Sequence, residues 1–125
     1  MTDSSSRSPA GEGEQAVAHP VVGDVYSVAS RAYDVIGKRE SHPVVVLSPI
    51  AGTDEWHVWL RTSKMDRPGI DHPPNLSLKL DRPGRFCGRD VTRLAGHVFV
   101  DPELSTHRGT LEPEMFKRLM DWWLA

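Results

Sequence analysis

The sequence predicts a mainly β fold, a small and strongly bent antiparallel barrel covered by one C-terminal helix. Several short segments carry β-branched or alternating apolar residues, and turns rich in glycine and proline separate them. Only the last segment, GTLEPEMFKRLMDWWLA, repeats its apolar residues at helical spacing. Short strands joined by long loops and followed by a single terminal helix are typical of such a barrel.

The first two expected strands differ in their burial. Residues 25–30, VYSVAS, follow Gly23 and Asp24 and alternate so that one face is more apolar than the other. Residues 42–50, HPVVVLSPI, contain an unbroken apolar run bounded by proline on both sides, which is typical of a fully buried central strand. The segment 31–41 between them carries a glycine and scattered charges, and we expect a loop there.

A hairpin is expected to follow the central strand. The turn AGTDE, residues 51–55, leads into WHVWLRT, residues 56–62, in which alternate residues share a face. We expect only one of the two faces to form the core. Trp56 and Trp59 point to opposite sides of this strand, so one is expected in the core and the other to cover the helix or to offer a stacking surface to a base.

Beyond the hairpin, the chain is expected to make a long excursion before further strands. Three prolines and a glycine interrupt residues 63–75. The leucines of LSLKL, residues 76–80, alternate with polar residues and predict a half-buried strand. Residues 85–100, RFCGRDVTRLAGHVFV, predict one or two strands that bend at Gly88 or Gly96.

The terminal segment carries the signals of a helix start. Pro113 suits the first turn, and the acidic neighbours Glu112 and Glu114 suit the positive end of the helix dipole. One face collects the apolar residues Phe116, Leu119, Met120 and Trp123. We expect this face to pack on the sheet, and Trp122 and Trp123 to make packing or dimer contacts.

Length and composition indicate one domain behind a disordered tail. The chain has 125 residues, a formal charge of −2 and a single cysteine, Cys87, which we expect to be a small buried side chain without an intramolecular disulfide. Residues 1–20 contain little to bury, so we place the domain at residues 21–125. The chain has neither an apolar run that could cross a bilayer nor a secretory signal, and we expect a cytoplasmic protein without membrane contact.

Basic residues cluster in the middle of the chain. Residues 61–93 hold eight lysines and arginines against four aspartates. This excess could meet phosphates, or it could form a solvated face of the barrel. The six histidines do not fall at the spacings of zinc ligands, so we expect no metal site.

Four short motifs occur in the order found in a known family. They are Gly23-Asp24 before the first strand, the valine-rich strand from Pro43 to Pro49, Thr62-Ser63 at the end of the next strand, and Gly109-Thr110-Leu111 before the helix. Together, over residues 23–124, they resemble the MazF/PemK family of toxin endoribonucleases. The resemblance implies an SH3-like barrel with a C-terminal helix, a homodimer that cleaves single-stranded RNA without metal or other cofactor, and inhibition by an antitoxin.

His42 stands directly before the proline of the valine-rich strand, where the family has an arginine, and the resemblance implies that the residue at this position acts on the scissile phosphate. Metal-free cleavage by a ribose 2′-hydroxyl needs a proton acceptor, a proton donor and charge stabilisation. Imidazole exchanges protons near neutral pH, whereas guanidinium does so poorly. The substitution therefore predicts acid/base work at His42.

The hypothesis of RNA cleavage leads to further expected site residues. His42 and Thr62 are expected to be catalytic. The residues expected around the RNA phosphates are Arg39, Arg61, Ser63, Arg85, Arg89 and Asp90. Because Arg61 alternates to the face opposite Thr62, we expect only one of these two in any cleft. Asp90 and Arg93 could instead form an exposed ion pair.

Two other functions are compatible with the sequence. The loop before the valine-rich strand, YDVIGKRES, lacks the family's pattern of an acidic residue followed by glutamine and glycine, although Asp34 or Glu40 could substitute for the acidic residue, and His42 removes a permanent charge. Both departures fit a catalytically inactive SH3-like barrel that binds nucleic acid or a partner protein. The tryptophan-rich helix fits a purely structural dimer module.

Overall fold

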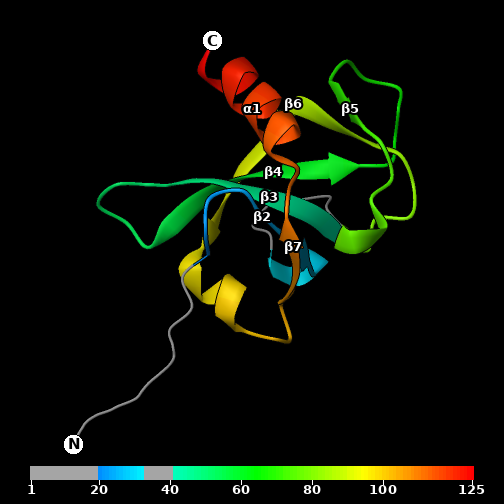
Figure 1. Ribbon diagram of the computed structural model, residues 1–125. Helices are drawn as coiled ribbons and strands as arrows, with labels where there is room; N and C mark the ends of the chain where they lie inside the picture. The colour runs from blue at the N-terminus through cyan, green and yellow to red at the C-terminus, as the bar shows by residue number, and fades with distance from the viewer. Residues whose placement is uncertain (1–19, 33–40) are drawn as a thin grey trace, which may run out of the picture.

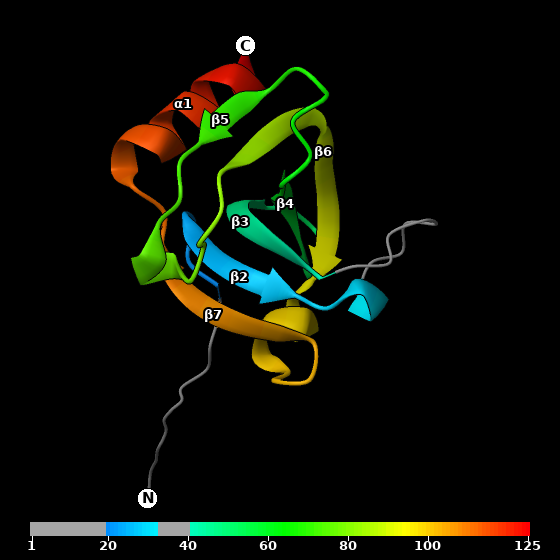
Figure 2. The same cartoon turned by 90° about the vertical axis from the view of Figure 1, so that its right-hand side faces the viewer.

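The computed structural model describes residues 20–32 and 41–125, and these residues form a curled half-barrel of six antiparallel strands with one C-terminal α-helix (Figures 1 and 2). The strand order is β5-β6-β4-β3-β2-β7. The predicted fold class is confirmed. Residues 1–19 and 33–40, for which a disordered tail and a loop were expected and which include Arg39, lie outside the described residues.

The elements have the following bounds. The strands are β2 (Asp24–Val28), β3 (His42–Pro49), β4 (Glu55–Thr62), β5 (Ile70–His72), β6 (Gly84–Ala95) and β7 (Ser105–Thr110). Three short 3-10 helices are η2 (Ser30–Ala32), η3 (Leu76–Leu78) and η4 (Gly96–Val100), and the α-helix is α1 (Pro113–Leu124).

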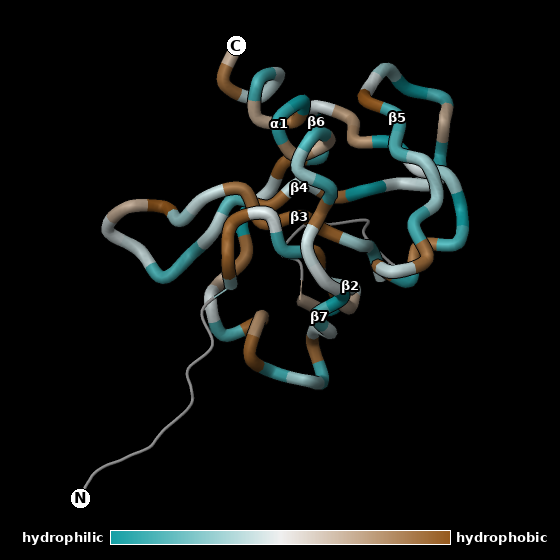
Figure 3. The backbone as a smooth tube through the Cα atoms, in the orientation of Figure 1, coloured by the Kyte–Doolittle hydropathy of each residue, from teal (hydrophilic) through white to brown (hydrophobic). Residues whose placement is uncertain are grey.

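The valine-rich strand β3 lies in the centre of the sheet, as predicted. It pairs with β2 on one side and with β4 on the other, and all of its residues from Val44 to Leu47 are buried. Because alternate side chains of a strand point to opposite faces, Val45 and Val46 enter two different apolar clusters. The hydrophobic segments gather along β3 and β4 in Figure 3.

Both faces of the curled sheet are covered, which corrects the expectation that only one face of residues 56–62 forms the core. Trp59 faces the side covered by α1 and η3, and Val58 faces the side covered by η4; neither side chain is exposed. The second cover comes from residues 96–100, for which the sequence predicted a strand. Phe99 of η4 instead packs edge-on against Tyr26 of β2.

The predicted strand at residues 76–80 is wrong. Residues 76–78 form η3, and Lys79 takes a left-handed conformation with φ 60°. The backbones of Asn75 and Leu80 exchange two hydrogen bonds, which closes a tight loop around η3. This loop buries Leu78 and Leu80 but leaves Leu76 at 75% exposed, so the three leucines do not share a strand face.

Strand β6 runs through Gly88 and ends before Gly96. Its pairing with β4 shifts between Trp59 and Arg61, where β6 carries extra residues around Gly88. The indole nitrogen of Trp59 donates a 2.8 Å hydrogen bond to the Cys87 carbonyl in this bulge. Cys87 is 1% exposed, as expected of a buried cysteine, and burial raises the pKa of its thiol.

The face of α1 centred on Leu119 should hold the helix on the sheet. Leu119 is fully buried in the cluster that contains Val45 and Trp59. We expect Leu119→Ala to lower the free energy of unfolding by about 2–5 kcal/mol in urea denaturation, as for other buried leucines. Lys117→Ala, which removes an exposed ion pair with Asp121 on the same helix, should cost less than about 0.5 kcal/mol. Equal losses in the two variants would show that the face does not pack.

Candidate functional site

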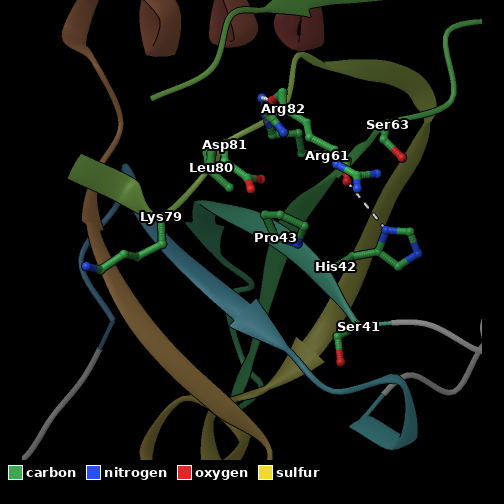
Figure 4. A pocket seen from close by; sticks show the side chains of 9 residues that line it. All are labelled: Ser41, His42, Pro43, Arg61, Ser63, Lys79, Leu80, Asp81 and Arg82. Carbon is green, nitrogen blue, oxygen red and sulfur yellow. Dashed lines mark hydrogen bonds between the residues drawn. The ribbon is translucent and has the colours of Figure 1, made fainter. Parts of the chain in front are cut away.

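An open pocket of about 190 Å³ lies where β3 begins and β4 ends (Figure 4). Its lining comes from three segments: residues 41–43, Arg61 and Ser63, and residues 79–82 after η3. The antiparallel pairing of β3 with β4 brings the first two segments together, because the start of one strand lies beside the end of the other. The left-handed turn at Lys79 brings the third segment to the pocket.

His42 is the side chain in this pocket that is best suited to proton transfer. It is half-buried, and its Nδ1 lies 3.4 Å from the backbone oxygen of Arg61. A carbonyl oxygen can only accept, so Nδ1 carries the proton whenever this long hydrogen bond forms. Nε2 is then the ring nitrogen that can accept a proton. In Figure 4, His42 and Ser63 lie toward one side of the pocket and Lys79 toward the other.

Arg61 lines the same pocket, but its guanidinium is held by the protein itself. Its Nε donates to Nδ1 of His72 at 2.8 Å, and one terminal nitrogen donates to the carbonyl of Arg82 at 2.7 Å and of His72 at 3.2 Å. A side chain at Gly84 would collide with this guanidinium, so the glycine makes room for it. Arg61 is 6% exposed, and its donors serve structural acceptors.

His72 extends this network to the start of α1. The Arg61 guanidinium can only donate, so Nδ1 of His72 accepts and the ring proton lies on Nε2. Nε2 then donates to the carboxylate of Glu112 at 2.9 Å, and Asn75 donates to the same carboxylate at 2.9 Å. The result is a relay from Arg61 through a fully buried imidazole to Glu112, which joins β4, β5 and the helix.

The two charged residues at the ends of this relay, Arg61 and Glu112, both have shifted pKa values. Burial lowers the pKa of the Arg61 guanidinium, and the charge of Glu112 opposes this shift. Burial also raises the pKa of the Glu112 carboxyl, but hydrogen bonds from Asn75, from the backbone and from His72 outweigh burial and leave this pKa below its ordinary value. Glu112 was expected to act on the helix dipole, but its main contacts are with β5 and the segment after it.

The lowered pKa of Glu112 predicts how stability depends on pH. A carboxyl whose pKa is lower in the folded state stabilises the fold above its ordinary pKa, and this stabilisation is lost as the pH falls through the lowered value. Glu112→Gln should therefore destabilise the protein at about pH 7, and the difference from the wild type should shrink below about pH 4 in urea denaturation. The exposed neighbour Glu114 supplies the control Glu114→Gln. A difference that stays constant over this range would contradict the relay.

The other expected site residues lie outside this pocket. Thr62 is 6% exposed, and its hydroxyl accepts the backbone N–H of Lys64 at 3.1 Å. Arg85 pairs with Asp71 at 2.6 Å and also donates to two carbonyls of the β4–β5 connection. Arg89 lines a second pocket beside Trp122.

Asp90 and Arg93 take different partners. Asp90 is 8% exposed and lies 3.8 Å from Arg67, whereas Arg93 pairs with Glu55 at 2.7 Å. The expected exposed pairing of Asp90 with Arg93 is therefore corrected. The segment between Asp90 and Arg93 belongs to β6, in which residues three apart point to opposite faces.

The pocket also contains two cations that sequence reasoning did not assign to it, Lys79 and Arg82. Both are exposed, and neither side chain makes a hydrogen bond or ion pair with another described residue. Four of the eight basic residues at 61–93 are engaged by acceptors or acidic partners: Arg61, Arg67, Arg85 and Arg93. Lys79 and Arg82 belong to the remainder, and Asp81 is the one acidic side chain among the described residues that line the pocket, so these residues together carry a net positive charge.

The part of the chain that the structure describes contains neither a candidate metal site nor a candidate membrane-spanning helix. No group of three or more His, Cys, Asp or Glu side chains in residues 20–32 and 41–125 could hold a metal ion. Within the same residues, no helix has the length and apolar character needed to span a bilayer.

No family model matches the chain, and no curated protein matches it.

Proposed function

We propose that this protein is a toxin-like, metal-independent endoribonuclease that cleaves single-stranded RNA. The observation that supports it most is the placement of His42 in one open pocket with two cations, Lys79 and Arg82, whose side chains have no partner among the described residues. A phosphodiester in this pocket would meet positive charge and a proton-transfer group together. The sequence motifs that resemble the MazF/PemK family support the choice of RNA over other phosphodiesters.

The proposed reaction is attack of a ribose 2′-hydroxyl on the adjacent phosphorus. The 2′-oxygen forms a bond to phosphorus while the bond from phosphorus to the 5′-oxygen breaks, which leaves a cyclic phosphate and a 5′-hydroxyl. Nε2 of His42 accepts the proton of the attacking hydroxyl while water protonates the leaving 5′-oxygen or, when Nε2 is protonated, it donates to the leaving oxygen while water takes the hydroxyl proton. Lys79 and Arg82 stabilise the charge that develops on the phosphorane oxygens.

The remaining assigned residues take supporting roles in this proposal. Ser63 is exposed and lines the pocket, and its hydroxyl can donate to a phosphate oxygen. Thr62 positions Ser63, because the Thr62 hydroxyl closes the turn to Lys64. Arg61 holds the segment that carries Arg82 instead of touching the phosphate. As the family resemblance implies, the toxin would act as a cytoplasmic homodimer and be inhibited by a cognate antitoxin.

Incubation of the purified protein with single-stranded RNA in the presence of a chelator tests the proposal. We expect cleavage products that end in a cyclic phosphate, and a rate that changes over about pH 5 to 8, where imidazoles exchange protons. Double-stranded RNA of the same sequence is the control and should resist cleavage, because its 2′-hydroxyls are held away from the in-line geometry. A broad panel of single strands that all remain intact would contradict the proposal.

A second candidate function is a catalytically inactive barrel that binds RNA or a partner protein. It is favoured by the engagement of Arg61 and Thr62 in internal hydrogen bonds, so that neither side chain is directed to a bound phosphate. This candidate predicts equilibrium binding of single-stranded RNA without any product over long incubation.

A further inference from the structure

Trp122, near the end of α1, presents an aromatic ring that is both exposed and fixed. It is 49% exposed, yet it stacks on the buried ring of Trp59 with centroids 5.5 Å apart and planes 23° apart. A side chain at Gly88 would overlap the Trp122 ring, so the glycine lets the indole lie directly against β6. The ring is therefore ordered before any ligand binds, so binding does not carry the entropic cost of fixing this side chain.

The exposed part of Trp122 lines a pocket of about 400 Å³, which is distinct from the pocket at His42. The other lining residues are Arg67 and Pro68 of the β4–β5 connection and Gly88 and Arg89 of β6. The volume falls within the range of about 300–1,000 Å³ that is usual for small-ligand sites. The two pockets share no lining residue.

The charges of the second pocket select an anion. Arg89 is exposed, and its side chain forms no hydrogen bond or ion pair with any other residue in the described ranges. Arg67 lies 3.8 Å from the buried carboxylate of Asp90, so its charge is partly balanced. The pocket thus combines a planar aromatic wall with one unengaged guanidinium, whose fork of donors matches phosphate geometry.

We propose that this pocket binds one nucleotide of a single-stranded nucleic acid, with the base stacked on Trp122 and a backbone phosphate on Arg89. Every base has a π-face that can stack on an indole, so the site would tolerate different sequences. The inference deepens the proposed function. It rests on that function in one respect, which is that the bound strand is RNA. The connection after β4 supplies Ser63 to one pocket and Arg67 and Pro68 to the other, so one strand could occupy both.

Fluorescence anisotropy of a labelled oligouridylate tests the proposal, with every protein carrying His42→Ala so that the strand stays intact. We expect Trp122→Leu to weaken binding about tenfold or more, the usual effect of removing one stacking platform. Arg89→Gln should also weaken binding and should reduce the slope of log affinity against log salt by about 0.7, as one phosphate contact is lost. Arg93→Gln removes the same charge from the same strand outside both pockets, and should change neither quantity.

Competition with polyphosphate separates stacking from simple attraction between charges. The oligouridylate should quench the fluorescence of Trp122, whereas polyphosphate, which has no bases, should not. Binding that Trp122→Leu and Arg89→Gln leave unchanged would overturn the inference even if the wild type cleaves RNA. Binding that both substitutions weaken would support it even if the wild type cleaves nothing. Two other results would overturn the inference. An acidic peptide that binds more tightly than the oligouridylate and displaces it would assign the pocket to a partner protein. Quenching of the Trp122 fluorescence that depends only on self-association of the protein would assign the pocket to a second copy of the chain.

Discussion

His42→Ala is expected to lower the rate of RNA cleavage by about 10²–10⁴-fold, the usual contribution of a positioned acid or base. The imidazole is half-buried at the edge of the pocket, and its hydrogen bond to the backbone oxygen of Arg61 is long, at 3.4 Å. The free energy of unfolding should therefore change little. Rates should be measured with a chelator present across about pH 5 to 8, where the wild type should show an inflection and the variant should not.

Two further substitutions make this experiment specific. His97→Ala removes an exposed histidine of η4 that lies outside the pocket, and it should leave the rate unchanged. His42→Arg restores the residue that the resembling family carries, and it should retain activity with a flatter pH profile. A full rate in His42→Ala would rule out proton transfer by this residue. If neither the wild type nor His42→Arg cleaves any RNA, the barrel should be studied as a binding module.

The sequence predicted the strands that bury their side chains and missed those that do not. Strands β3 and β4 were predicted because β-branched and aromatic residues alternate or run together in them. β7 has the sequence STHRGT and lies at an edge of the described sheet, where it pairs with β2, so backbone hydrogen bonds specify it more than apolar contacts do. β5 is only three residues long and also lies at an edge of the sheet. Neither edge strand has a pattern that could have revealed it.

The location of the pocket could be predicted from the sequence, but its working residues could not. A hairpin between residues 42–49 and 55–62 necessarily brings His42 near the end of β4. Which cations remain available to a ligand depends on contacts between distant segments. Arg61 is engaged because His72 and Arg82 come to it from elsewhere in the chain. Lys79 and Arg82 reach the pocket because residues 76–78 form a 3-10 turn instead of the predicted strand.

The relay that starts at Arg61 should be among the most sensitive parts of the fold. We expect Arg61→Met to lower the free energy of unfolding by about 3–5 kcal/mol in urea denaturation, the range for breaking a buried charged network from one side. Methionine has a similar length, so the main loss is of donors. Nδ1 of His72 and the carbonyls of His72 and Arg82 would lose the hydrogen bonds that Arg61 gives them.

Arg93→Met is the matched control, since Arg93 is 54% exposed in its pairing with Glu55 and should contribute less than about 1 kcal/mol. Arg61→Lys should recover only part of the stability, because one ammonium cannot reach both His72 and Arg82 as the guanidinium fork does. Since Arg61 holds the carbonyl of Arg82, the lysine variant should also loosen the segment that carries Lys79 and Arg82 into the pocket. RNA affinity should then fall in a protein that still folds. Full affinity in a folded Arg61→Lys variant would show that the relay supports the barrel without positioning its pocket.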